Sequence, residues 1–287
     1  MLAALAPLLL AQKSSTAQPA SSSTTELPSK ATVESFLKHW FGYDPSISPE
    51  VADISPSPIP GMAQVLVSLG TGNDRKNMLL YITPDQHHAI VGEVLPFGAD
   101  PFAAGRALIA QSNTGVARGP EKSQLTFVEF SDLECPVCKQ AQPTIDKLLA
   151  EYPQARFVFQ QFPLEQVHPW AFKAALYADC VGRESNTAFW KFVQSVYDDQ
   201  LTIDPTNADT KLREKAAAAG APADRTAACV TNPETGQRVR ESLALGKALD
   251  VHGTPTLFIN GRRINNVLGM PFELLKDVVI WAEKDAK

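Results

Sequence analysis

The feature of this sequence that most constrains its fold is an apolar strand that leads through two closely spaced cysteines into an amphipathic helix. Residues 125–130 form an apolar run with the length of a buried strand. The sequence CPVC follows at 135–138, where Pro136 suits the first turn of a helix. Apolar side chains then recur at helical spacing to about residue 152. This passage from strand to helix predicts an α/β domain with both cysteines at the junction.

The chain continues to alternate between strand and helix patterns after this point. The predicted elements are strands at 156–162, 256–259 and 262–264, an alanine-rich helical stretch at about 168–249, and a closing helix at 271–284. Breaks in the helical stretch are expected at Gly182, around Pro205 and at 220–222. The dipeptide Asn260-Gly261 predicts a tight hairpin turn. This order is similar to that of the thioredoxin fold with a helical insertion.

The first part of the chain predicts a small α+β unit, which consists of a helix and an antiparallel sheet. Its predicted elements are a helix at 31–42, strands at 62–68, 77–82 and 89–95, hairpin chemistry at 70–74, and a helix at 100–111. The proline-rich segment 46–60 predicts only an extended or turning path. The predicted divisions are a signal-like segment and tether at 1–30, the small domain at 31–112, a linker at 113–123 and the thioredoxin-fold catalytic domain at 124–287.

The N-terminus predicts export. Residues 2–11 have the length of a signal-peptide apolar region and are too short to cross a bilayer as a helix. No Lys or Arg precedes them, although a complete signal peptide would need one. Residues 12–30, rich in Ser, Thr, Ala and Pro, predict a flexible tether. Four cysteines fit an oxidising compartment, so a periplasmic or other extracytoplasmic location is expected.

The overall composition excludes one class of partner. The chain is 44% apolar and 20% charged, with a formal net charge of −5, which is ordinary for a globular protein. No basic excess indicates binding to nucleic acid.

The two cysteines of CPVC are expected to differ in reactivity. Cys135, at the start of the helix, would lie over unpaired backbone N–H groups and the positive end of the helix dipole, which favour its thiolate. Cys138, one turn further, would lie deeper and resolve a mixed disulfide. A zinc clamp would need four converging ligands, and Cys180 and Cys229 form no second close pair. We therefore predict redox chemistry with no metal.

Two further regions are expected near the cysteines, with their roles left open by the residues alone. Glu129 would be either a buried proton relay for Cys138 or a solvated strand residue, and alternation does not decide between them. In the segment 252–256 (HGTPT), a cis bond before Pro255 would leave the backbone of Thr254 free to pair with an extended substrate. An ordinary trans proline at a strand entry is the alternative.

Residues 130–138 (FSDLECPVC) and 251–261 (VHGTPTLFING) together resemble the DsbA-type branch of the thioredoxin superfamily, over about 124–287. The resemblance implies a nucleophilic Cys135, a resolving Cys138, a buried acid at Glu129 and a cis Thr254-Pro255 bond. It also implies that proteins or peptides with thiols or disulfides are the substrates, and that a redox partner protein, in some members membrane-bound, exchanges electrons with the dithiol. No cofactor is then needed.

The same resemblance bears on the remaining cysteines and on the direction of exchange. Paired cysteines in the insertion of related proteins form a second disulfide, which implies a structural bridge between Cys180 and Cys229; two separate buried thiols are the alternative. Strongly oxidising members carry a His where Val137 stands. A less oxidising couple is therefore expected, which favours a reductase or isomerase over an oxidase.

The small domain is similar to the N-terminal domain of the DsbC and DsbG disulfide isomerases, over about 31–97. Its motifs are the sequences at 61–66 and 81–93. The resemblance implies a homodimer formed through this domain. Any other small domain of one helix and a sheet remains an alternative, and so does a chaperone-like module in which CPVC is a structural disulfide.

Four further histidines are expected to lie on the surface or to have structural roles. His87 and His88 are adjacent, so their side chains would point to opposite faces of a strand and we expect them on the surface. His168 lies at a helix start, and His252 borders the proline loop, where it could tune Cys135. A structural role is expected for both.

Overall fold

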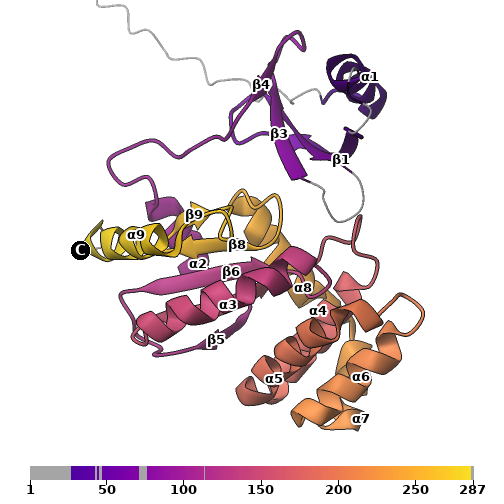
Figure 1. Ribbon diagram of the computed structural model, residues 1–287, viewed down its shortest axis with the longest axis vertical. Helices are drawn as coiled ribbons and strands as arrows, with labels where there is room; N and C mark the ends of the chain where they lie inside the picture. Colours follow the sequence, from indigo (N-terminus) through magenta and orange to yellow (C-terminus); the bar gives the residue numbers. More distant parts are fainter. Residues whose placement is uncertain (1–26, 43, 45–46, 71–75, 113, 286–287) are drawn as a thin grey trace, which may run out of the picture.

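The computed structural model describes residues 27–42, 44, 47–70, 76–112 and 114–285. It contains a four-stranded sheet with the order β1-β2-β3-β4 and a five-stranded sheet with the order β5-β7-β6-β8-β9. Figure 1 shows the small sheet with helix α1 beside it, above a larger part built around the second sheet. The predicted fold class, a small α+β unit followed by an α/β part with a helical insertion, is confirmed.

The small sheet has one strand more than the sequence predicts. Its elements are α1 (Lys30–Phe41), β1 (Glu50–Pro56), β2 (Ala63–Leu69), β3 (Lys76–Ile82) and β4 (Ala89–Val91). All neighbouring strands are antiparallel, and α1 packs on the sheet through Val33 and Leu37. The segment 46–60 was expected only to extend or turn, yet it contains β1. Because β1 is an edge strand, it tolerates Pro56, which has no N–H to donate.

Two predictions for the first part fall outside the described residues. The signal-like segment and most of the tether lie in 1–26, and the expected hairpin turn lies mostly in 71–75. No helix of the described residues has the length and apolar character needed to cross a membrane.

The larger sheet has β6, the strand that leads to the CPVC turn, at its centre. Its strands are β5 (Val116–Arg118), β6 (Thr126–Ser131), β7 (Arg156–Gln161), β8 (Thr256–Ile259) and β9 (Arg262–Ile264). Strand β6 runs parallel to β7 and antiparallel to β8. The predicted linker 113–123 is not entirely a connection, because β5 lies within it and pairs antiparallel with β7. Three residues at a sheet edge are too short to give a periodic signal.

Helices cover both faces of β6. On one face, Phe127 packs with Ile145 of α3 (Pro136–Glu151) and Leu275 of α9 (Phe272–Asp285). On the other face, Phe130 packs with side chains from α2 (Ala103–Gln111) and α8 (Pro233–Ala248). A strand buried on both faces shows no alternation of apolar and polar residues, which is why the sequence left the position of Glu129 open.

The helical insertion lies to one side of the sheet (Figure 1). It consists of α4 (Ala171–Glu184), α5 (Asn186–Asp198), the short 3-10 helix η2 (Gln200–Thr202), α6 (Ala208–Ala219) and α7 (Ala223–Val230), followed by α8. The expected breaks near Pro205 and at 220–222 are observed.

The break expected at Gly182 is wrong, because this glycine lies inside α4. A Cβ at Gly182 would lie 2.5 Å from Cγ2 of Val116, so the residue permits close packing of α4 on β5. The break falls three residues later, where the Ser185 side chain accepts a hydrogen bond from the Ala188 N–H and begins α5.

Helix α2 belongs by its contacts to the larger part of the molecule. Ile109 packs into the cluster that contains Phe130, and the Arg106 side chain donates to the Asn260 carbonyl at 3.5 Å. The sequence assigned α2 to the small domain 31–112. That boundary stays a prediction, and these contacts favour an earlier one.

Candidate active site at the CPVC turn

The turn after β6 presents the two cysteines at the start of α3. The Cys135 N–H donates to the Asp132 carbonyl at 3.1 Å, and Cys135 is the residue that precedes the first turn of the helix, which Pro136 opens. Cys135 is 5% exposed, whereas Cys138 is fully buried. Both are free thiols in the described part of the chain. Only Cys135 is therefore within reach of another molecule.

The surroundings of the two thiols shift their pKa values in opposite directions. The Cys138 thiol donates to the Cys135 sulfur and, against the effect of burial, lowers the pKa of Cys135 to about 6, with further help from Thr254 and the Cys138 N–H. Burial and then the neighbouring Cys135 raise the pKa of Cys138 well above its ordinary value. At neutral pH Cys135 is mainly thiolate and Cys138 stays a thiol.

The proline loop lies against Cys135 although it follows 119 residues later in the chain. The Thr254-Pro255 bond is cis, and the Cys135 sulfur lies 3.6 Å from the Thr254 carbonyl oxygen. Strand β8, which begins directly after Pro255, pairs with β6, which ends at Ser131, four residues before Cys135. The sheet register therefore brings these two motifs together.

Glu129 is completely buried under α3. Its Oε1 accepts a hydrogen bond from Nε2 of Gln142 at 2.9 Å, and its Oε2 has no partner among the described residues. Burial raises the pKa of Glu129 to about 7, and hydrogen bonds from Ser131 and Gln142 oppose this only in part. The same Gln142 Nε2 donates to the Cys138 carbonyl at 3.3 Å, so it links this acid to the turn that carries the dithiol.

A second acidic cluster beside the dithiol was missed at the sequence level. The buried Asp132 carboxylate accepts hydrogen bonds from the Glu134 N–H (2.8 Å), the Leu164 N–H (2.8 Å) and Nδ1 of His168 (2.7 Å). Oε2 of Glu134 accepts the Trp170 N–H at 2.6 Å, and burial raises the pKa of Glu134 to about 7. Asp132 and Glu134 lie close to Cys135 in the sequence, but no sequence pattern indicated that they pair with residues more than 30 positions later in the chain.

Gln200 is another contact that sequence reasoning missed. From η2 its Nε2 donates to the carbonyl oxygens of Leu133 at 2.8 Å and Cys135 at 3.1 Å. This buried amide fixes the backbone on which the reactive sulfur is carried.

The other cysteines form a disulfide between α4 and α7. Cys180 and Cys229 have Cα atoms 5.8 Å apart and are bonded through their sulfurs. Asp179 lies within 4.8 Å of both sulfurs, but cysteines joined to each other do not offer the thiolates that a metal ion needs.

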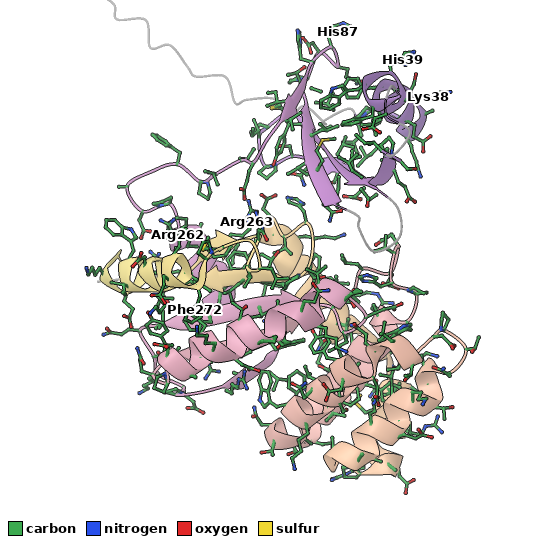
Figure 2. The ribbon with its side chains drawn as sticks, viewed as in Figure 1. Lys38, His39, His87, Arg262, Arg263 and Phe272 are labelled. Carbon is green, nitrogen blue, oxygen red and sulfur yellow. A yellow bond between two sulfur atoms is a disulfide. The ribbon has the colours of Figure 1, made fainter. Side chains whose placement is uncertain are left out.

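The remaining histidines lie in different surroundings. Figure 2 shows His87 at the far tip of the small sheet, away from the larger part. His87 and His88 are both exposed in the turn before β4, not within a strand as the sequence reasoning assumed. Nε2 of His252 lies 2.7 Å from Oδ1 of Asp250, and its Nδ1 lies 3.4 Å from Nε2 of Gln64. His252 therefore joins the small unit to the proline loop.

A CxxC turn between a central strand and a helix, opposite a proline loop, defines a thioredoxin-fold protein with a dithiol site. The chain belongs to the thioredoxin family: the family model described as Thioredoxin matches residues 111–270.

Solved structures share this fold. The transitional conformation of Proteus mirabilis ScsC has a TM-score of 0.54 and 17% identity, covering 64% of this chain and 79% of that chain. Oxidised BdbD from Bacillus subtilis has a TM-score of 0.52 and 20% identity, covering 60% of this chain and 100% of that chain. A single-residue variant of alpha-DsbA1 from Wolbachia pipientis has a TM-score of 0.52 and 18% identity, covering 63% of this chain and 97% of that chain. The resemblance to the DsbA-type branch is confirmed at the level of the fold.

Curated relatives match through about half of this chain. The Na(+)/H(+) antiporter NhaA 3 of Salinispora tropica is 33% identical over 146 residues, which are 51% of this chain and 22% of that protein. The NhaA antiporter of Herminiimonas arsenicoxydans is 33% identical over 148 residues, again 51% and 22%. The chain spans about a fifth of the length of these relatives.

Proposed function

We propose that this protein is a thiol–disulfide oxidoreductase that exchanges disulfides with proteins or peptides through Cys135 and Cys138. The observation that carries the proposal is the asymmetry of the two thiols. Cys135 keeps a small exposed fraction of 5% and its pKa is lowered to about 6, whereas Cys138 is fully buried and its pKa is raised. Attack and resolution need such a pair, because a thiolate is the nucleophile and a stable thiolate is also the better leaving group.

The exchange is a two-electron transfer with no cofactor. In the reducing direction, the Cys135 thiolate attacks a substrate disulfide, one substrate sulfur leaves as a thiolate, and a mixed disulfide forms. Cys138 then loses its proton and attacks the Cys135 sulfur, which releases the second substrate sulfur and leaves the pair oxidised. The oxidising direction is the reverse.

Glu129 is our candidate for the proton acceptor of Cys138. Its pKa of about 7 allows it to gain and lose a proton near neutral pH, and Gln142 links it to the Cys138 turn. The burial of both groups supports this role, since solvent water cannot easily take the Cys138 proton.

The proline loop is our candidate for the substrate site. The backbone of Thr254 lies beside the Cys135 sulfur, so an extended chain that pairs with Thr254 and Pro255 would hold its own sulfur next to Cys135.

The direction of exchange and the location are further parts of the proposal. Val137 gives the Cys135 thiolate neither charge nor a hydrogen bond from its side chain, which favours a reductase or isomerase. The Cys180–Cys229 disulfide supports an exported, extracytoplasmic protein. A Salmonella enterica structure of the same fold is described as a periplasmic thioredoxin-like protein, with 23% identity and a TM-score of 0.51. A redox partner protein and dimerisation through the small unit complete this proposal.

Trapping of the mixed disulfide tests the proposed function. C138S leaves the attacking thiol and removes the resolving one, so it is expected to retain a peptide that carries a disulfide, visible as added mass. C135S is the matched control and is expected to retain none. Equal trapping by both variants, or by neither, would overturn the proposal and leave the chaperone-like module with a structural CPVC disulfide.

The reduction potential of the dithiol, measured by equilibration in glutathione buffers, and the molecular mass in solution then distinguish an isomerase from an oxidase. An intermediate potential with a dimeric mass supports an isomerase, and a high potential with a monomeric mass supports an oxidase.

A further inference from the structure

His168 is a titratable group near the dithiol for which the exchange steps give no role. It lies in the loop before α4, and its side chain is 17% exposed. Its Nδ1 lies 2.7 Å from Oδ2 of Asp132, whose side chain is completely buried. A buried carboxylate is costly unless it is paired, and the two backbone N–H groups that Asp132 also binds supply no full charge.

Asp132 by itself acts against the thiolate. It lies three residues before Cys135, and the negative charge of its carboxylate raises the pKa of both thiols. A protonated His168 opposes that charge. Burial lowers the pKa of His168, but the hydrogen bond and charge of Asp132, with the charges of Cys135 and Glu134, raise it above its ordinary value overall.

We propose that His168, held by Asp132, is a positioning residue that balances the buried carboxylate and gives the Cys135 thiolate the positive charge that Val137 does not supply. The proposal rests on the proposed function, in which Cys135 is the attacking thiolate. The histidine comes from the start of the helical insertion, outside the CPVC motif. The charged and titratable groups that face it are Asp132, Glu134 and Cys135.

The two partly buried histidines of this part of the molecule provide a matched pair of variants. His168 and His252 each have a ring nitrogen 2.7 Å from an aspartate carboxylate oxygen, and their side chains are 17% and 23% exposed. In the described residues no hydrogen bond or ion pair joins His252 to the dithiol, since it contacts Asp250 and Gln64. H168Q keeps a hydrogen-bond donor for Asp132 but removes the charge, and H252Q makes the same change at the other site.

The first measurement is a pH titration of the Cys135 thiolate by its ultraviolet absorbance in the reduced protein. H168Q is expected to raise the pKa of Cys135 by about one unit from about 6, so that the thiolate fraction at pH 6 falls roughly fivefold. H252Q is expected to leave it unchanged. An unchanged Cys135 titration in folded H168Q would overturn the proposal and reduce His168 to an anchor for its loop.

A second measurement needs no variant and so remains decisive if H168Q does not fold. By reciprocity, a thiolate that is stabilised by His168 must raise the titration midpoint of that imidazole by the same amount. NMR titration of the histidines is therefore expected to give a higher midpoint for His168 in the reduced protein than in the protein with an oxidised dithiol, with His252 as the internal reference. Equal midpoints in both redox states would refute the role of His168. Failure of mixed-disulfide trapping would instead overturn the proposed function, without affecting either protonation readout.

Discussion

The Cys138 thiol is the largest single cause of the lowered pKa of Cys135. It donates to the Cys135 sulfur, while burial opposes ionisation. Because Cys138 itself is fully buried and its pKa is raised, it keeps its proton where the thiolate of Cys135 can use it. The reactivity of one sulfur is therefore a property of the pair.

Removal of the Cys138 donor tests this dependence. C138A is expected to raise the pKa of Cys135 from about 6 by at least about one unit, because the thiolate loses a hydrogen bond. C138S, whose hydroxyl can still donate, is expected to stay closer to the wild type. The rate of iodoacetamide alkylation as a function of pH measures both midpoints, and identical midpoints in the two variants would contradict the assignment.

The buried acid Glu129 makes stability depend on pH. Its pKa is raised from 4.5 to about 7, so between these values the folded protein holds more protons than the unfolded chain. The free energy of unfolding therefore falls as pH rises through this window, and above pH 7 the protein carries the whole penalty for ionising the buried Glu129. A shift of this size corresponds to about 3 kcal/mol.

Glu129→Gln is expected to stabilise the protein at pH 8 by up to about 3 kcal/mol and to have little effect at pH 4, where the acid is already neutral. The amide oxygen can still accept the Gln142 hydrogen bond. Urea unfolding at the two pH values measures the difference. Glu151→Gln, an exposed acid on α3, is the control and should show no such dependence; the same difference in both variants would exclude burial as its cause.

At the scale of elements, one disulfide bond connects two helices of the insertion. The Cys180–Cys229 disulfide ties α4 to α7 across 49 residues, and the Thr235 hydroxyl at the start of α8 lies 3.5 Å from the Cys229 sulfur. The short α7 has one fully buried residue, Thr226, so packing alone holds it weakly.

Replacement of both cysteines by alanine, C180A/C229A, is expected to lower the free energy of unfolding by about 4 kcal/mol, the chain-entropy estimate for a loop of this length. Trapping by C138S in this background should persist, since the site lies on other elements. Denaturant unfolding of the oxidised proteins measures the loss. A change below about 1 kcal/mol would mean that the helices hold the insertion together without the bond.

At the scale of the whole molecule, polar contacts join the small unit to the proline loop. Arg263 of β9 forms ion pairs with Asp250, beside the loop, and with Glu93, and Nδ2 of Asn265 donates to Glu93 at 2.7 Å. Figure 2 shows Arg263 on the side of the larger part that faces the small sheet. Because Glu93 is 44% exposed, we expect each such contact to contribute little by itself.

Glu93→Ala is expected to lower the free energy that holds the small unit in place by less than about 1 kcal/mol. Proteolysis of the segment 92–102 is therefore expected to become measurably faster, by up to about fivefold, because the small unit loses one attachment. Limited digestion followed by mass spectrometry locates and times the cut. Glu121→Gln, a second exposed acid, is the control. If both variants are cut at the same rate as the wild type, the Glu93 contacts do not hold the two parts together.

Local patterns in the sequence were sufficient for most helices and for the long strands, because periodicity and turn residues act within a few positions of one another. They also placed the CPVC turn at a helix start and the proline loop before a strand. They missed β1 and β5, which both lie at a sheet edge. Strand β1 lies in a proline-rich segment that predicts only an extended or turning path, and β5 has only three residues. Both strands are defined mainly by the neighbour with which they pair.

The sequence by itself determined that this chain has a strand-to-helix dithiol and the order of elements around it. Only the tertiary structure decided the electrostatics of that dithiol. Glu129 is buried because helices cover both faces of its strand. Asp132 meets His168 because β7 runs parallel to β6, so the loop that follows β7 lies at the same edge of the sheet as the CPVC turn. These are contacts between residues far apart in the chain, and their burial, which sets the pKa of each group, exists only after the whole chain has packed.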